Sequence, residues 1–285
     1  MNKLNSDGIT IGLYEKALPD NLEWKERFDQ TRSAGFGFME FSIDESDMRL
    51  ERLKWDKKKI KKLRDLAVDH GTPLLTMCLS ANRRFPFGSD YPDIQKKGIE
   101  VLESAIRFAS LMGIRIVQVA GYDVLMNKEI STEKTKKAFM ANLREGLKLA
   151  SSLGVMLAIE NVDVDFADSI VKTMYFVNEF KSPWLQIYPD IGNLSAMNYN
   201  VLEQLKQGTG HIAAVHAKDT LDGVVRRVPY GEGTVDFASA FRELKGAGFY
   251  GPVLLEMWAD ENKDNFKIVK DARDWIFKKI NEAGY

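Results

Sequence analysis

The sequence predicts a single (β/α)₈ barrel over residues 1–285. Three observations support this fold class. Eight short apolar runs, of the kind that form buried strands, alternate with helical patterns along the whole chain. The 285 residues allow about 36 residues for each strand–helix unit, near the usual size for such barrels. No linker rich in Pro, Gly or Ser divides the chain. The alternative, a doubly wound open sheet, would normally carry a Gly-rich dinucleotide loop after an early strand, and none is present.

In the first half of the chain, apolar runs alternate with segments whose apolar residues recur every three or four positions. The Lys-rich segment 55–70 is an example: Ile60, Leu63 and Leu66 share one side, and Gly71 ends the pattern. We expect strands at Ile9–Tyr14, Phe36–Ile43, Leu74–Leu79 and Ile114–Ala120, and helices at Leu22–Ala34, Trp55–His70, Ile94–Leu111 and Thr132–Leu153.

The second half repeats this rhythm, and each of its four predicted strands closes on an ionisable residue. We expect strands at Val155–Glu160, Leu185–Asp190, His211–His216 and Pro252–Glu256, and helices at Ser169–Phe180, Asn200–Gln207, Phe237–Ala247 and Asn265–Ala283.

Composition and charge exclude several classes of protein. The net charge is −1, from 40 basic and 41 acidic residues, which argues against a broad nucleic-acid or membrane surface. No run of 18 apolar residues occurs, and the N-terminal MNKLNSDG lacks an apolar signal region. The single cysteine, Cys78, cannot form an internal disulfide and is expected to be a buried, inert thiol. We expect a cytoplasmic protein.

The four ionisable strand ends are Glu160, Asp190, His216 and Glu256, separated by 30, 26 and 40 residues. Taken alone, each acid is more commonly a helix cap or a surface group. Together, at the C-terminal ends of four successive barrel strands, they converge on the usual place of the active site. Three carboxylates and an imidazole at one point repel each other without a cation, so we predict a divalent metal site. The mixed ligand set accepts Zn²⁺, Mn²⁺, Co²⁺ or Mg²⁺. The other histidines, His70 and His211, are expected to be structural.

Basic residues near other strand ends are candidates for binding substrate, although a solvated surface charge is the plainer interpretation of each. Lys218 lies two residues after His216, so strand alternation directs it to the same side. The Gly231–Asp236 loop precedes a helix where barrels often bind phosphate, and Asp236 is equally well explained as the N-cap of that helix. The candidate substrate-binding residues are Lys218, Arg83, Arg84, Asn193, Arg226, Gly231 and Gly233.

Long motifs in the chain resemble those of a known family. They are Gly12–Pro19 (GLYEKALP), Met77–Ser89 (MCLSANRRFPFGS), Gln118–Val124 (QVAGYDV), Tyr188–Ala196 (YPDIGNLSA), Val215–Thr220 (VHAKDT), Val228–Phe237 (VPYGEGTVDF) and Leu254–Trp258 (LLEMW). The family is the L-ribulose-5-phosphate (L-xylulose-5-phosphate) 3-epimerases of L-ascorbate utilisation, which are xylose-isomerase-like barrels. The resemblance covers nearly the whole chain. The sequence departs from an enterobacterial member at 160–163, where Glu-Asn-Val-Asp replaces a more apolar Glu-Ile-Met-Asp and the glutamate is retained.

The resemblance implies an isomerase that inverts C3 of a ketopentose 5-phosphate in pentose catabolism. It places a divalent metal on Glu160, Asp190, His216 and Glu256. Zn²⁺ or Mn²⁺ is expected in preference to Co²⁺ or Mg²⁺. The two glutamates are implied to act as the acid/base pair, removing and returning a proton through an enediolate. It also implies a homodimer. From the residues alone, an aldose–ketose isomerase and a non-catalytic sugar-phosphate-binding barrel both remain open.

Overall fold

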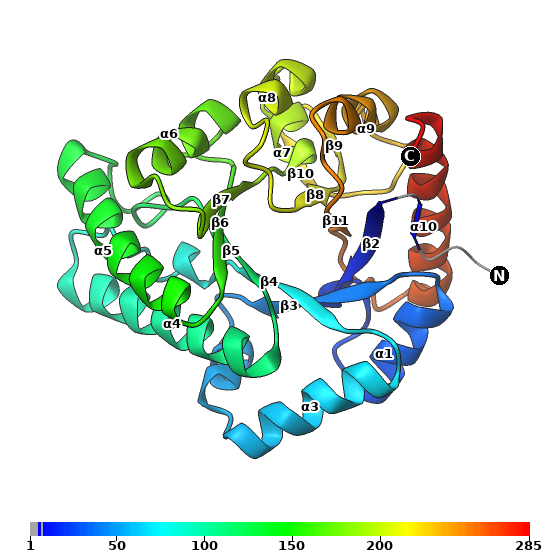
Figure 1. Ribbon diagram of the computed structural model, residues 1–285, viewed down its shortest axis with the longest axis horizontal. Helices are drawn as coiled ribbons and strands as arrows, with labels where there is room; N and C mark the ends of the chain where they lie inside the picture. The colour runs from blue at the N-terminus through cyan, green and yellow to red at the C-terminus, as the bar shows by residue number, and fades with distance from the viewer. Residues whose placement is uncertain (1–4, 7) are drawn as a thin grey trace.

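The computed structural model describes residues 5, 6 and 8–285 and shows a parallel barrel inside a ring of helices (Figure 1). The barrel strands are β2 (Ile9–Tyr14), β3 (Phe38–Ile43), β4 (Leu74–Leu79), β5 (Ile116–Ala120), β6 (Met156–Glu160), β7 (Leu185–Tyr188), β8 (Val215–Ala217) and β11 (Pro252–Leu255). They pair in the order β7-β6-β5-β4-β3-β2-β11-β8, and a short strand, β1 (Asn5–Ser6), lies antiparallel to β2. Parallel bridges Ile187–Ile212 and Asp190–His216 close the ring. The predicted (β/α)₈ fold is confirmed.

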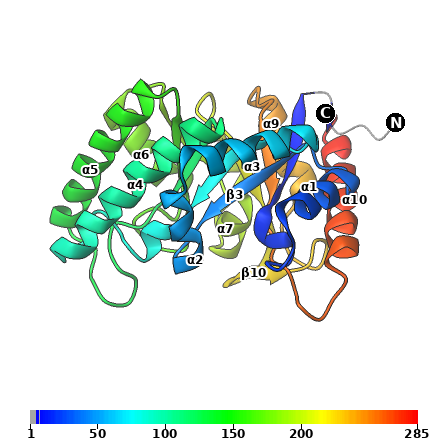
Figure 2. The ribbon, with the colours of Figure 1, turned by 90° about the horizontal axis from the view of Figure 1, so that it is seen from below.

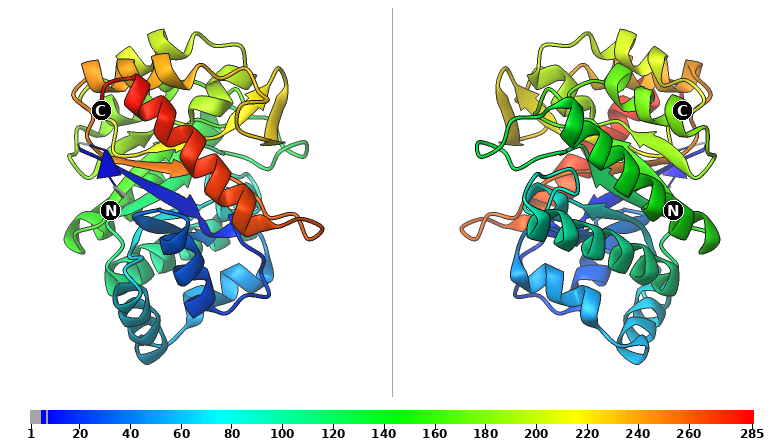
Figure 3. Two further views of the ribbon diagram at one scale, coloured as in Figure 1. Left: turned by 90° about the vertical axis from the view of Figure 1, so that its right-hand side faces the viewer. Right: turned by 90° about the vertical axis from the view of Figure 1, so that its left-hand side faces the viewer.

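The helices cover the outside of the barrel. They are α1 (Trp24–Ser33), α3 (Lys57–Asp69), α4 (Pro92–Met112), α5 (Glu133–Ser152), α6 (Ile170–Phe180), α8 (Val201–Gln207), α9 (Phe237–Gly246) and α10 (Asn265–Glu282). The short elements α2 (Asp47–Leu50), α7 (Ile191–Ala196), η1 (Glu15–Ala17), η2 (Glu51–Lys54) and η3 (Ala81–Arg83) lie in the connections after strands. Figure 3 shows the last helix, α10, outside the part of the barrel that contains β2. Within residues 8–285, no helix is long and apolar enough to cross a bilayer. Residues 1–4 and 7 lie outside the described residues. They include part of the N-terminal segment that was predicted to lack an apolar signal region.

Local side-chain chemistry sets the helix ends. The Asp56 side chain accepts a hydrogen bond from the Lys59 amide and begins α3, and Ser169 begins α6 in the same way. Asp236 accepts from the Ser239 amide and caps α9, so the N-cap interpretation of that residue is correct. Gly113 ends α4 with φ +83°, a conformation that costs glycine little.

Aromatic packing between strands and helices fixes the helical layer. Phe41 of β3 stacks on Phe108 of α4 with ring centroids 5.1 Å apart, and Phe139 of α5 lies 4.5 Å from Phe87. The interior of the barrel is different, because it contains fully buried polar side chains: Glu40, Thr76, Gln118, Asp190 and His216. Burying such groups is costly unless they bind one another or a ligand, so the interior is where function is to be sought.

The connection after β8 is a hairpin, where a loop was expected. Strands β9 (Asp219–Leu221) and β10 (Val224–Val228) pair antiparallel around Asp222-Gly223, and Gly223 has φ +67°. Asp-Gly between apolar residues is a hairpin signal that the sequence contains. In Figure 2, β10 lies on the same edge of the molecule as α2, which follows β3 directly. The hairpin therefore lies at the C-terminal ends of the barrel strands.

Several predicted strands are shorter than expected, β7 and β8 among them. β7 ends at Tyr188, because Pro189 has no amide hydrogen to continue the ladder and Asp190 instead begins α7. β8 begins only at Val215, while Ile212 makes one isolated bridge to Ile187.

Candidate active site

The fold brings the four ionisable strand ends to one point. Glu160 is the last residue of β6, Asp190 follows β7, His216 lies in β8, and Glu256 directly follows β11. Each offers one ligand atom, and these atoms all lie within 4.8 Å of one another. Three of the residues are buried and Glu256 is half-buried. The convergence follows from parallel pairing, because the C-terminal ends of neighbouring strands share one rim.

Asp190 is held by two asparagines. Its backbone amide donates to Asn161 Oδ1 at 2.8 Å, and Asn161 Nδ2 donates back to the Asp190 carbonyl at 3.0 Å. The Asn193 amide donates to Asp190 Oδ1 at 2.9 Å, and Asn193 Nδ2 donates to the Asn161 carbonyl at 2.9 Å. Asn161 therefore supports the cluster through Asp190.

Glu160 and His216 are also constrained on both sides. Gln118 Nε2 donates to Glu160 Oε2, and His216 Nδ1 lies 2.6 Å from Glu160 Oε1. His216 Nε2 lies 2.9 Å from Glu40 Oε1. Burial would lower the pKa of His216, but Glu40 and Glu160 raise it well above the usual value. Carboxylates therefore face both ring nitrogens of His216.

Lys218 places an ammonium group beside the cluster. Its Nζ lies 2.6 Å from Asp190 Oδ2 and 2.7 Å from Glu256 Oε2. Burial raises the pKa of Asp190 to about 6 despite Lys218. Burial would also raise the pKa of Glu256, but the charge of Lys218 outweighs burial there and lowers the pKa to about 2. Burial would lower the pKa of Lys218, and the carboxylates of Asp190 and Glu256 raise it instead. Lys218 stays an ammonium group at neutral pH.

The cluster fits a divalent cation. Asp190 Oδ2 is buried and has no hydrogen-bond partner, and its charge is met by the Lys218 ammonium group 2.6 Å away. A buried carboxylate oxygen that depends on a neighbouring cation in this way is suited to coordinate an ion. Three carboxylates and one imidazole are the ligands that Zn²⁺, Mn²⁺, Co²⁺ and Mg²⁺ accept in various proportions, so the ligand set does not select one ion.

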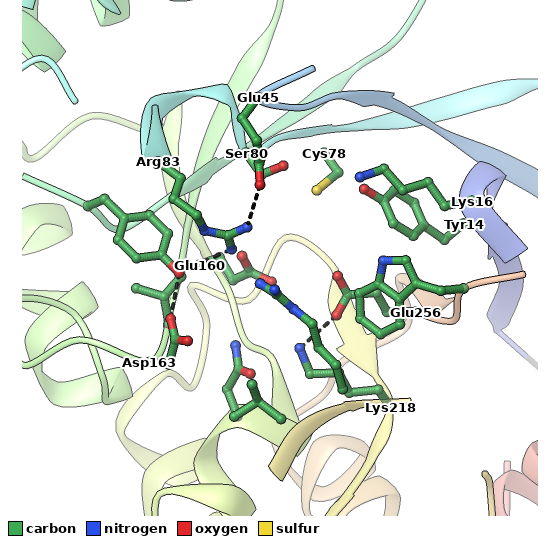
Figure 4. Close-up of a pocket in the computed structure, with 16 residues that line it drawn as sticks. Tyr14, Lys16, Glu45, Cys78, Ser80, Arg83, Glu160, Asp163, Lys218 and Glu256 are labelled. Atoms are coloured by element: carbon green, nitrogen blue, oxygen red, sulfur yellow. Dashed lines mark hydrogen bonds and ion pairs between the residues drawn. The ribbon is translucent and has the colours of Figure 1, made fainter. Parts of the chain in front are cut away.

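A pocket opens over the cluster, and Figure 4 shows Arg83, Glu160, Lys218 and Glu256 directed into it. Arg83 donates to Tyr122 Oη at 3.1 Å and to Glu45 Oε1 at 3.4 Å. The pocket is lined by Tyr14, Lys16, Glu45, Cys78, Ser80, Arg83, Tyr122, Glu160, Val162, Asp163, Asn193, Lys218, Val225, Arg226, Glu256 and Trp258.

Of the seven predicted substrate-binding residues, the pocket contains Lys218, Arg83, Asn193 and Arg226. Arg226 comes from β10, and its guanidinium lies 5.9 Å from the Trp258 ring centroid, as does Lys218 Nζ. The hairpin that the sequence did not predict thus carries a cation to the pocket.

The other three predicted residues lie elsewhere and already have partners. Arg84 donates to the Glu45 carbonyl at 2.8 Å and to Asp47 Oδ1 at 2.7 Å, on the outer side of the loop. The amides of Gly231 and Gly233 both donate to Asp219 Oδ2, at 2.8 and 3.0 Å. The loop thus binds a carboxylate of its own chain at the place proposed for a phosphate.

Sequence reasoning missed several pocket residues. Lys16 and Tyr14 lie in the GLYEKALP motif and Trp258 in LLEMW, so the motifs contained the signal without assigning a role. Tyr14 packs edge-on to Trp258, with ring centroids 6.4 Å apart. Cys78 is buried as expected, and burial raises its pKa well above the usual value, but it also lines the pocket.

The remaining histidines have structural partners away from the cluster. His70 Nδ1 lies 2.5 Å from Asp29 Oδ1, and His211 Nδ1 lies 2.9 Å from Gln186 Oε1.

Comparison with known proteins identifies the class of barrel. The profile of the xylose isomerase-like TIM barrel family matches residues 28–279, and the chain belongs to that family. It is similar to the L-ribulose-5-phosphate 3-epimerase UlaE of Escherichia coli O1:K1, with 43% identity over 279 residues that cover 98% of each chain. The same values hold for the protein of that name from Escherichia fergusonii. The resemblance inferred from the motifs is confirmed.

Solved structures share the fold at low identity. An L-ribulose 3-epimerase matches with a TM-score of 0.77 and 21% identity, over 96% of this chain and 95% of that one. A D-psicose 3-epimerase from Clostridium cellulolyticum H10, solved with D-tagatose, matches with a TM-score of 0.82 and 14% identity, over 95% and 99%.

Proposed function

We propose that the protein is a metal-dependent isomerase that interconverts L-ribulose 5-phosphate and L-xylulose 5-phosphate by inverting C3. The observation that carries the proposal is the presence of two glutamates, Glu160 and Glu256, within one cluster of metal-ligand type. The relatives named L-ribulose-5-phosphate 3-epimerase, 43% identical over 98% of the chain, support this choice of substrate. A place in L-ascorbate catabolism is the role that the resemblance implies.

The two glutamates approach the pocket from different sides. β6 and β11 are three strands apart around the ring, separated by β7 and β8. Inverting C3 requires a proton to leave one face and return to the other, and a single base would tend to restore the original configuration. Glu160 and Glu256 would each hold or accept that proton at a carboxylate oxygen, exchanging roles as base and acid with the direction of reaction.

A divalent ion held by Glu160, Asp190, His216 and Glu256 would polarise the carbonyl and offset the negative charge that develops beside it. Lys218 donates to Glu256 at 2.7 Å and lies over the cluster, where its ammonium group can hold a substrate oxygen. The backbone amide of Asn193 keeps Asp190 oriented. The enclosing side chains limit the access of water, which strengthens these electrostatic interactions.

Phosphate binding is assigned to cations at the pocket. Arg83, Arg226 and Lys16 line it together with Lys218. Arg83 is buttressed by Tyr122, whose hydroxyl donates to Asp163 Oδ1 at 2.5 Å. Binding energy from this remote group would position C3 at the two glutamates. Phosphorylated ketopentoses should therefore be turned over with a much larger kcat/KM than the free sugars.

NMR of L-ribulose 5-phosphate in D₂O with the metal-loaded enzyme tests the proposal. Deuterium at C3, together with the appearance of L-xylulose 5-phosphate, is the expected result. Deuterium at C1 or C2 would instead indicate an aldose–ketose isomerase, and no exchange would indicate a binding protein. If the free ketopentose is turned over with the same kcat/KM as its 5-phosphate, the substrate is not specifically a sugar phosphate.

A further inference from the structure

Glu40 is a buried carboxylate at the centre of the barrel for which sequence reasoning found no role. It lies in β3 and is fully inaccessible to solvent. Its Oε2 accepts hydrogen bonds from Thr76 Oγ1 at 2.6 Å and from Tyr188 Oη at 2.9 Å. Its Oε1 lies 2.9 Å from His216 Nε2. Four barrel strands, β3, β4, β7 and β8, therefore meet at this one carboxylate.

The imidazole of His216 is contacted at both ring nitrogens and on one face of the ring. Nε2 faces Glu40, while Nδ1 faces Glu160 at 2.6 Å within the cluster. The Tyr188 ring packs against the imidazole with centroids 4.4 Å apart. The same tyrosine hydroxyl binds Glu40, so one side chain orients both partners.

We propose that Glu40 is a positioning residue for His216, an inference that rests on the proposed metal site. The hydroxyls of Thr76 and Tyr188 donate to one oxygen of Glu40, and the other oxygen accepts from Nε2–H. The proton on Nε2 leaves the lone pair of Nδ1 directed at the cluster. A carboxylate that accepts from the distal nitrogen of a histidine fixes its tautomer and ring orientation and strengthens it as a metal ligand.

Comparison with a second buried carboxylate separates this role from simple packing. Glu15 is also fully buried, but Arg52 pairs with it at 2.7 Å and Arg49 at 3.3 Å. Among the described ion pairs, Glu40 has no Lys or Arg partner, and the side chain that it faces is the imidazole of His216. Burying a carboxylate without an arginine partner costs stability. The presence of Glu40 here therefore fits a role toward the imidazole that it faces.

The test measures zinc affinity by competition with a chelator in wild type, Glu40→Leu, Glu40→Gln and the control Glu15→Gln. Glu40→Leu removes the acceptor and should weaken zinc binding by about 10- to 100-fold. Glu40→Gln should lose less, because an amide oxygen can still accept from Nε2–H. Glu15→Gln should lower the melting temperature and leave zinc affinity unchanged.

Labelling histidine with ¹⁵N gives a readout that packing alone would not move, because the chain has only 3 histidines to assign. Zinc-loaded wild type should show Nε2 protonated and Nδ1 coordinated at His216, and Glu40→Leu should lose this pattern. Folded Glu40→Leu with zinc affinity within about threefold of wild type and an unchanged His216 spectrum would overturn the proposal. If Glu40→Leu does not fold, the zinc affinity of Glu40→Gln decides: wild-type affinity overturns the proposal, and a loss of affinity absent from Glu15→Gln supports it.

The outcome is distinguishable from failure of the proposed function. Wild type that binds zinc through His216 without exchanging the C3 proton would refute the epimerase assignment and leave the role of Glu40 standing. Wild type that binds no divalent ion would overturn both.

Discussion

Replacing Glu256 by glutamine should nearly abolish epimerisation while the metal site still loads. Glu256 Oε2 accepts a hydrogen bond from Lys218 at 2.7 Å, which an amide oxygen can also accept. Lys218 keeps a second partner, Asp190 Oδ2, at 2.6 Å. Glutamine therefore preserves the shape, the lysine contact and one potential ligand oxygen, but it cannot take up a proton. Loss of a general base typically costs 100- to 10,000-fold in rate, equivalent to about 2.7–5.5 kcal/mol of barrier.

The assay follows both the full and the partial reactions. Interconversion of the two ketopentose phosphates by metal-loaded Glu256→Gln and Glu160→Gln is measured beside C3 proton exchange in D₂O from each epimer. Each variant retains one base, so one should still exchange the C3 proton of L-ribulose 5-phosphate and the other that of L-xylulose 5-phosphate. Metal content is measured in every sample, since lost metal would mimic a lost base.

The two-base mechanism makes both glutamates necessary. A metal-replete Glu160→Gln or Glu256→Gln enzyme that epimerises at close to the wild-type rate would refute it. Exchange from the same single epimer in both variants would also contradict the assignment of the glutamates to opposite faces.

Three further predictions concern the ion, the phosphate and the folded state. Chelation should abolish activity. For an ion present at about 100 times its Kd, it should also remove about 2.7 kcal/mol of stability, or about 5–10 °C in melting temperature by calorimetry. Metal-free protein that keeps full activity and an unchanged melting temperature would exclude the site. Arg83→Met should lower kcat/KM for the phosphorylated substrate by about 10- to 100-fold through loss of a charge-assisted hydrogen bond, whereas the neighbouring control Arg84→Met should stay near wild type; equal losses would remove Arg83 from the phosphate site. Burial would raise the pKa of Asp44, but hydrogen bonds from Lys16 and Ser46 lower it from 3.8 to about 2. The Asp44 carboxylate therefore contributes about 1–2 kcal/mol of stability after solvent screening, fully above about pH 4 and hardly at all near pH 2. In urea, the free energy of unfolding of Asp44→Asn should be lower than that of wild type above pH 4, and the two should converge near pH 2.

Sequence alone determined the barrel and the ionisable cluster, because both follow from short-range patterns. Apolar runs alternating with helical periodicity define the strand–helix units, and parallel strands must place their C-terminal ends at one rim. Glu160, Asp190, His216 and Glu256 could therefore be grouped although up to 96 residues separate them. The same reasoning placed Lys218 beside His216.

Other features depended on contacts that no local pattern encodes. Arg83 and Arg84 are neighbours in the sequence, but successive residues of the 3₁₀ turn point in directions about 120° apart, so Arg83 enters the pocket and Arg84 faces outward. The glycine loop resembles an anion site, and only the folded chain shows that Asp219 binds its amides.

Glu40 is the clearest case of a role that tertiary structure alone decided. It stands in the middle of an apolar strand, with no motif beside it, and 176 residues separate it from His216. The direction of a barrel strand's side chain can be inferred from alternation, but the partner it meets across the barrel depends on the stagger of all eight strands. That long-range geometry places Glu40 against the imidazole of His216.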